Sequence, residues 1–131
     1  MNALFHAHSG LRYVVLLFAL VNIVVLAIGI ATKKPFGKLH RALGASFAGT
    51  LHLQVIIGVA VALTRQYYPA LIGHFAMMFM AAGVAQACMS INRRKPQPTL
   101  TLPLIGIVIA LALICGGIMA IQRGILQSTA F

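Results

Sequence analysis

Histidine is the residue type in this chain with the widest choice of chemistry. Five histidines occur, at positions 6, 8, 40, 52 and 74, and there is no Asp or Glu anywhere in the 131 residues. Without carboxylates the chain cannot build a paired-carboxylate hydrolase, an aspartate-backed triad, or a magnesium or calcium site. Neutral imidazoles remain available to ligate haem iron or another metal, to carry protons, or to hydrogen-bond between helices.

Two of the histidines lie inside apolar runs. His52 is near the middle of its run, where an ionisable side chain is expensive and usually faces the protein interior. Its possible roles are a hydrogen bond to a neighbouring helix, ligation of haem or a metal, or a part in proton or quinone chemistry. His74 lies about one turn inside its run and is followed by methionines, which suit the wall around a flat cofactor. It is a candidate ligand or a structural histidine.

The N-terminal segment carries the other notable side chains. We expect a non-helical entry in which His6 and His8 form a weak metal-binding pair, or in which His8 alone is an axial ligand, and in which Ser9 caps the following helix. Arg12 either extends to lipid headgroups or pairs with a buried anion such as a haem propionate. His40 lies among basic residues, and we expect it at headgroup level.

The amino-acid composition of the chain indicates that these histidines and Arg12 lie on membrane-spanning helices. The chain is 61% hydrophobic and 8% charged, which excludes an ordinary water-soluble domain. Apolar stretches cover roughly residues 11–31, 42–64, 70–91 and 100–122, each about 21–23 residues and long enough to span the bilayer as a helix. Because the links are short, we predict a single all-α domain, 1–131, that forms a four-helix transmembrane bundle in up-down-up-down order.

The basic residues predict how this bundle lies in the membrane. They occur in short blocks between apolar runs, which argues against nucleic-acid binding and favours an orientation signal. The first and third links hold seven of them: Lys33, Lys34, Lys38, Arg41, Arg93, Arg94 and Lys95. The opposite side holds Arg12, Arg65 and Arg123, together with Tyr13, Tyr67 and Tyr68. Positive charge stays in the cytoplasm, so both termini are predicted outside, in the periplasm of a bacterial plasma (inner) membrane.

Small and polar residues at helical spacing predict which face of each span turns inward. For the first and second spans these residues are Arg12, Ala19, Asn22, Gly29, Ala45, Ala48, His52 and Val55. For the third and fourth spans they are His74, Met78, Ala81, Ala85, Cys88, Gly106, Ala110, Gly117, Ala120 and Gly124. Each polar residue thus shares a stripe with small ones.

Two resemblances follow from these motifs. The segments 40–44 and 52–58 look like the His-x-x-x-Gly and Gln-x-x-x-Gly patterns of four-helix membrane b-type cytochromes. That resemblance implies a haem clamped between imidazoles of two helices, with basic groups meeting its propionates. Over nearly its whole length the chain also resembles a group of small bacterial four-span membrane proteins, which brings no established activity. The shared residues are the entry His6 to Tyr13, His52, Gln54 and Gly58, and His74, Met77 and Met78.

We therefore expect a small integral-membrane protein that binds haem b and transfers electrons, with quinone or a larger respiratory or photosynthetic complex as partner. The candidate iron ligands are His52, His74 and His8, and Arg12 is the candidate propionate partner. His52 lies ~18 Å from the end of its span, whereas His74 lies only ~7 Å from the neighbouring end of its own span, so the two differ in depth. Either a tilted haem binds to both of them, or His8 and His74 are the two iron ligands. The alternatives are a cofactor-free accessory subunit of an energy-transducing complex, and a copper or proton carrier.

Overall fold

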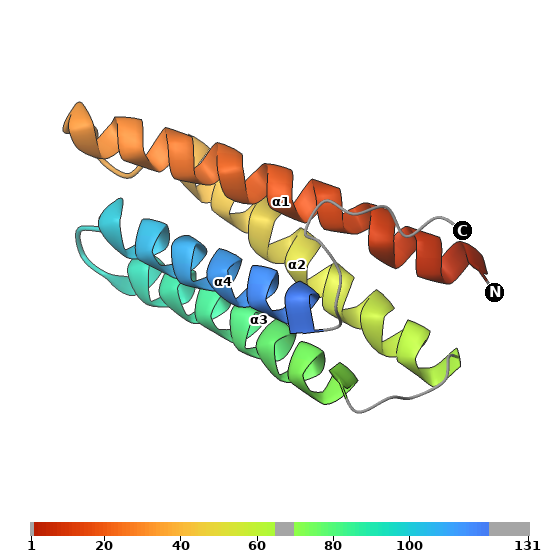
Figure 1. Cartoon of the computed structure of the whole chain (residues 1–131). Coiled ribbons are helices and arrows are strands. Elements are labelled where there is room, and N and C mark those ends of the chain that lie inside the picture. The colour runs from red at the N-terminus through yellow and green to blue at the C-terminus, as the bar shows by residue number, and fades with distance from the viewer. Residues whose placement is uncertain (1, 65–69, 121–131) are drawn as a thin grey trace.

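The computed structural model describes residues 2–64 and 70–120, and within them the chain forms four α-helices (Figure 1). Their bounds are Asn2–Ala31 (α1), Lys38–Thr64 (α2), Ala70–Arg94 (α3) and Thr101–Ala120 (α4). All four are long and apolar enough to cross a membrane. Within the described residues, the prediction of an all-helical chain with four helices long and apolar enough to span a membrane is confirmed.

The helices pack as two close pairs. α1 lies along α2 and α3 along α4, and the pairs meet where α1 touches α4 and α2 touches α3 (Figure 1). α3 and α4 are in very close contact, because Gly106 has no side chain and Cys88 occupies the space where a Cβ would lie. The least extensive of these contacts is between α2 and α3.

Two of the links are fixed by local hydrogen bonds. At the end of α1, Lys33 adopts a left-handed φ of 57°, and the Lys34 N–H donates to the carbonyl of Gly29 over 2.8 Å. This is the arrangement that commonly satisfies the last carbonyls of a helix. Between α3 and α4, the buried Asn92 amide donates to the Thr99 carbonyl and accepts from the Thr99 N–H, both over 2.9 Å.

The start of α1 differs from the sequence prediction. Instead of a non-helical entry before residue 11, the helix begins at Asn2, and Ser9 is buried within it rather than capping it. Nothing in the segment breaks a helix, since it contains no proline and its backbone gains hydrogen bonds by continuing. α2 and α3 also extend beyond their predicted spans, to Lys38 and Arg94, because each adds a basic turn outside the apolar run.

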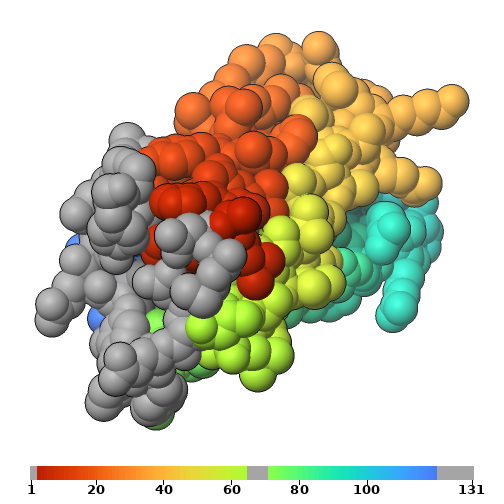
Figure 2. Space-filling model, turned by 90° about the vertical axis from the view of Figure 1, so that its right-hand side faces the viewer, coloured from red at the N-terminus to blue at the C-terminus, as the bar shows by residue number. Residues whose placement is uncertain are grey.

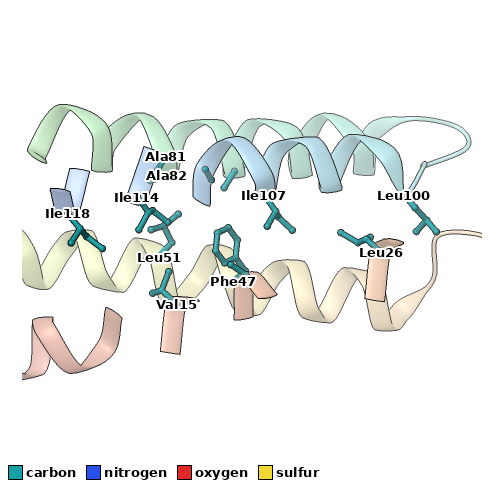
Figure 3. Packing of buried hydrophobic residues seen from close by; sticks show 13 residues of the cluster. Val15, Leu26, Phe47, Leu51, Ala81, Ala82, Leu100, Ile107, Ile114 and Ile118 are labelled. Atoms are coloured by element: carbon teal, nitrogen blue, oxygen red, sulfur yellow. The ribbon is translucent and has the colours of Figure 1, made fainter. Parts of the chain in front are cut away.

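The core runs along the bundle axis, with Phe47 and Leu51 of α2 facing Ile107 and Ile114 of α4 (Figure 3). The predicted inward residues of α1 are all buried, as are most of those of α4, while those of α3 are buried or half-buried. Gly124 lies outside the described residues, as do Arg65, Arg123, Tyr67 and Tyr68.

The predicted inward face of α2 is only partly correct: Ala48 is buried and Val55 packs against the core. Ala45 and His52 are exposed, and the buried polar side chain of this helix is Gln54. α2 carries small residues on several faces around position 48, so spacing alone does not select the buried one. Phe47 and Leu51 decide the rotation, because these large side chains fill the core.

Candidate functional site

A cavity of about 220 Å³ lies at the end of the bundle where the chain begins. It is bounded by the first turns of α1 and α3 and by the second halves of α2 and α4. From this end, the first turns of α1 lie beside the second half of α2 (Figure 2). Most of the lining is apolar, and the polar exceptions are His8, Ser9, Arg12, Gln54 and His74. An apolar cavity with a few converging polar groups is the usual form of a small-molecule site.

Two imidazoles lie close together in the lining of this cavity. The ring centres of His8, from α1, and His74, from α3, are 6.5 Å apart, and their planes are inclined at 83°. Two imidazoles that bind one metal ion from opposite sides have ring centres about 6.3 Å apart, since each metal–nitrogen bond is about 2.0–2.1 Å and each nitrogen lies about 1.1 Å from its ring centre. The separation is therefore close to that of two axial ligands on one iron atom.

The ring of His74 is held in one orientation by a neighbouring helix. Its Nδ1 lies 2.8 Å from the carbonyl oxygen of Gly117 in α4, so we assign the ring proton to Nδ1 as the donor of this hydrogen bond. The other ring nitrogen, Nε2, then carries a lone pair. Metal-binding histidines are commonly fixed in this way, with one nitrogen donating to a backbone carbonyl and the other bound to the metal.

His8 has a different environment. Its Nδ1 is buried and has no hydrogen-bond partner among the described residues. Its ring rests on α2 at Gly58, where an added Cβ would lie 2.8 Å from the His8 Cε1 atom. The Gln54 side chain donates to the His8 backbone carbonyl over 2.7 Å, which ties the start of α1 to α2, while the Gln54 Oε1 atom is buried without a described partner. A buried polar atom without a partner costs free energy, and a ligand that supplied one would recover it.

Arg12 brings positive charge into the same cavity. Its side chain is 7% exposed, donates from a terminal nitrogen to the Tyr13 hydroxyl over 2.7 Å, and lies 4.6 Å from the centre of the Tyr13 ring. A buried guanidinium beside two imidazoles favours an anionic group, and its fork of donors suits a carboxylate.

His52 lies outside this cavity. It is exposed, and its Nε2 is 3.1 Å from the Gln86 Oε1 atom of α3, in a second cavity toward the other end of the bundle. The structure thus brings together His8, His74 and Arg12 but not His52. Of the two ligand pairs considered from the sequence, the described geometry favours His8 with His74.

The remaining histidines have simpler surroundings. His6 is exposed on α1. His40 accepts a hydrogen bond from the Gly37 N–H over 3.0 Å and stacks on Phe36 with ring centres 5.7 Å apart, so it stabilises the start of α2. Three features of the site were not predicted from the sequence: the Gly117 carbonyl, the close approach at Gly58, and the inward position of Gln54. Gln54 and Gly58 do belong to the Gln-x-x-x-Gly pattern, which is a signal that could have located them.

Comparisons with protein-family models, with characterised proteins and with solved structures gave no match for this chain. Within residues 2–64 and 70–120, no cluster of three or more His and Cys side chains could hold a metal ion. A zinc site typically takes three or four protein ligands, whereas a haem iron takes at most two from the protein. Two neighbouring imidazoles with one buried arginine fit haem by donor type.

The size of the cavity sets a condition on that fit. About 220 Å³ lies below the ~300–1,000 Å³ typical of small-molecule pockets, and a haem is larger than the space present. Binding a haem here requires the helices to separate further. Contact between α2 and α3 is less extensive than the contacts α1–α2, α3–α4 and α1–α4, and both helices line the cavity, so separation at this contact disrupts few packing interactions.

Proposed function

We propose that this chain is a small integral-membrane protein that binds b-type haem between His8 and His74 and transfers electrons. The observation that carries the proposal is the pair of imidazoles from α1 and α3 with ring centres 6.5 Å apart. One of these rings is already oriented by the Gly117 carbonyl. Further support comes from the buried Arg12 in the same cavity and from the absence of acidic residues.

Each residue has a defined part in this proposal. His8 and His74 would hold the iron from opposite sides, and Arg12 would meet a propionate. Bound haem would supply reversible one-electron chemistry. The apolar side chains of α2, α3 and α4 that line the cavity exclude water, and the Gly117 carbonyl keeps the His74 ring in its ligating orientation.

The proposed setting is a bacterial plasma membrane, with an up-down-up-down bundle and both termini in the periplasm. The excess of basic residues in the first and third links supports this orientation. It would place the site near the periplasmic face. A membrane-soluble quinone, or a larger respiratory or photosynthetic complex, would exchange electrons with it there.

Haem titration of the purified protein tests the proposal. We expect wild-type protein to give a Soret band that saturates near one haem per chain. His8→Ala and His74→Ala should each lose the low-spin six-coordinate spectrum, because each removes one axial ligand. His52→Ala is the matched control, since His52 lies outside the cavity, and it should bind as wild type does. Equal loss in all three variants, or in none, would contradict the assignment.

A cofactor-free accessory subunit of an energy-transducing complex is the second candidate. The observation that favours it is the His74–Gly117 hydrogen bond, which joins α3 to α4 as a purely structural histidine would. Blue-native electrophoresis of gently solubilised membranes distinguishes the two. A colourless protein that migrates only within a large assembly would support the subunit, whereas a haem-containing protein would support the electron carrier.

A further inference from the structure

A second cavity of about 280 Å³ lies between α2 and α3, toward the end of the bundle opposite the histidine pair. At one end of it are Arg41, in the first turn of α2, and Arg93, in the last turn of α3. Both side chains are exposed. Their positions at helix ends place the two guanidinium groups at the level of lipid headgroups.

Polar groups continue from the arginines into the cavity. Arg93 donates to the Ser90 hydroxyl over 3.4 Å, and the Gln86 amide donates to the same hydroxyl over 2.8 Å. Gln86 in turn pairs with His52, 3.1 Å away. From Arg93 to Gln86 the helix rises ~10 Å, so a molecule with its charged end at the arginines would meet hydrogen-bonding groups along that depth.

Between the basic first turn of α2 and His52, the α2 wall of the cavity consists of small residues: Gly44, Ala45, Ala48 and Gly49. A Cβ added at Gly49 would have no atom within 4 Å, so the space beside it is open. A wall of small residues could also pack against a helix of a second copy of this chain. Charge argues against that occupant, because a second copy would bring more Arg side chains to this face and the sequence has no Asp or Glu to neutralise them.

We propose that this second cavity binds an anionic phospholipid, with its phosphate between Arg41 and Arg93. The charge of the two arginines selects a negative headgroup, and a basic pocket between transmembrane helices suits such headgroups. The glycerol region would lie at the depth of Gln86, and the acyl chains would lie against the small residues of α2. This inference does not depend on haem binding.

Native mass spectrometry of the purified full-length protein tests the proposal, with phosphatidylglycerol and phosphatidylcholine of identical acyl chains added in turn. We expect wild-type protein to retain phosphatidylglycerol preferentially. Arg41→Gln with Arg93→Gln should reduce that preference by roughly 25-fold, at roughly fivefold for each charge. Lys33→Gln with Lys95→Gln removes two exposed charges that do not line the cavity and should preserve the preference.

A steric variant tests the small-residue wall separately. Gly49→Leu should lower lipid retention because it fills open space inside the cavity, whereas Gly83→Leu, also in open space but outside the cavity, should not. Equal retention of both lipids by wild-type protein, or equal effects of the two charge variants, would overturn the proposal. Displacement of the lipid by inorganic phosphate alone would show a phosphate site instead, and a dimer abolished by Gly49→Leu would show a second copy.

Discussion

At the scale of residues, the histidine site depends on backbone as much as on side chains. The Gly117 carbonyl orients His74, and the missing side chain at Gly58 allows the His8 ring to lie against α2. Neither contribution is an imidazole or an arginine, yet both determine where the imidazoles point. The site is therefore sensitive to small changes at positions that carry no functional group.

Gly58 provides the sharpest residue-level prediction. Gly58→Ala places a Cβ 2.8 Å from the His8 Cε1 atom, which forces the ring to move. We expect haem affinity to fall about tenfold, which corresponds to about 1.4 kcal/mol, with helix content unchanged. Haem titration followed by the Soret band measures it. Gly49→Ala is the matched control because its Cβ would enter open space, and unchanged affinity in Gly58→Ala would contradict the assigned position of His8.

The sequence predicts candidate site residues but not all of the groups that surround them. His8, His74 and Arg12 were predicted site residues, and the structure places all three around one cavity. His52 was predicted to face inward and does not, because burial of Phe47 and Leu51 turns it outward. The His74–Gly117 bond was beyond prediction, since a backbone carbonyl leaves no trace in residue identity.

At the scale of elements, close contact between α3 and α4 sets the width of the bundle. The Cβ of Cys88 would lie 2.5 Å from a Cβ added at Gly106, and neither atom can rotate away. Gly106 is also buried, so there is no lipid-facing space to take up an added group. The two helices therefore approach at this level as closely as a glycine permits.

Gly106→Ala should consequently push α3 and α4 apart. We expect a loss of about 1–3 kcal/mol in stability, the usual cost of overpacking, and a lower melting temperature in detergent. Circular dichroism during heating measures it. Gly83→Ala on the open surface of α3 is the control and should be neutral or slightly stabilising, because alanine favours helix. A melting temperature for Gly106→Ala equal to that of the control would show that the contact is not tight.

The helices themselves were predictable, whereas their rotation was only partly so. Apolar runs of spanning length predicted four helices, and α1 turns the expected residues inward, including Asn22, which bonds to the Leu43 carbonyl of α2 over 3.0 Å. In a membrane the lipid-facing side is apolar too, so hydrophobicity does not mark the buried side of α2. The helical turns of α1 before residue 11 were not predicted, because a segment with two histidines and a serine resembles a non-helical connection.

At the scale of the whole molecule, the basic residues separate the two ends of the bundle. The links after α1 and α3, together with the first turn of α2 and the last turn of α3, carry most of the positive charge, and the histidine site lies toward the other end. The proposed orientation places these links in the cytoplasm and the site near the periplasm. Neither location follows from the packing of the helices alone.

Labelling of cells tests this orientation. In a background with Cys88→Ala and Cys115→Ala, we expect Ala7→Cys to react with a membrane-impermeant maleimide added outside spheroplasts, and Lys34→Cys to react only after lysis. Both positions are exposed, so accessibility within the protein is matched. The reverse pattern would place the histidine site in the cytoplasm and would contradict the proposed electron-transfer partners on the periplasmic side.

The proposed haem site lies between α1 and α3, in the cavity that all four helices line. The sequence could supply the donors, but the cavity exists only where all four helices meet, so it could not be predicted from any one span. The most direct test is the absorption spectrum of wild-type protein purified from haem-replete cells, before and after reduction with dithionite. We predict a Soret band that shifts on reduction together with a sharp α band, as expected for iron held by two imidazoles. A colourless preparation that also fails to take up added haem would contradict the account.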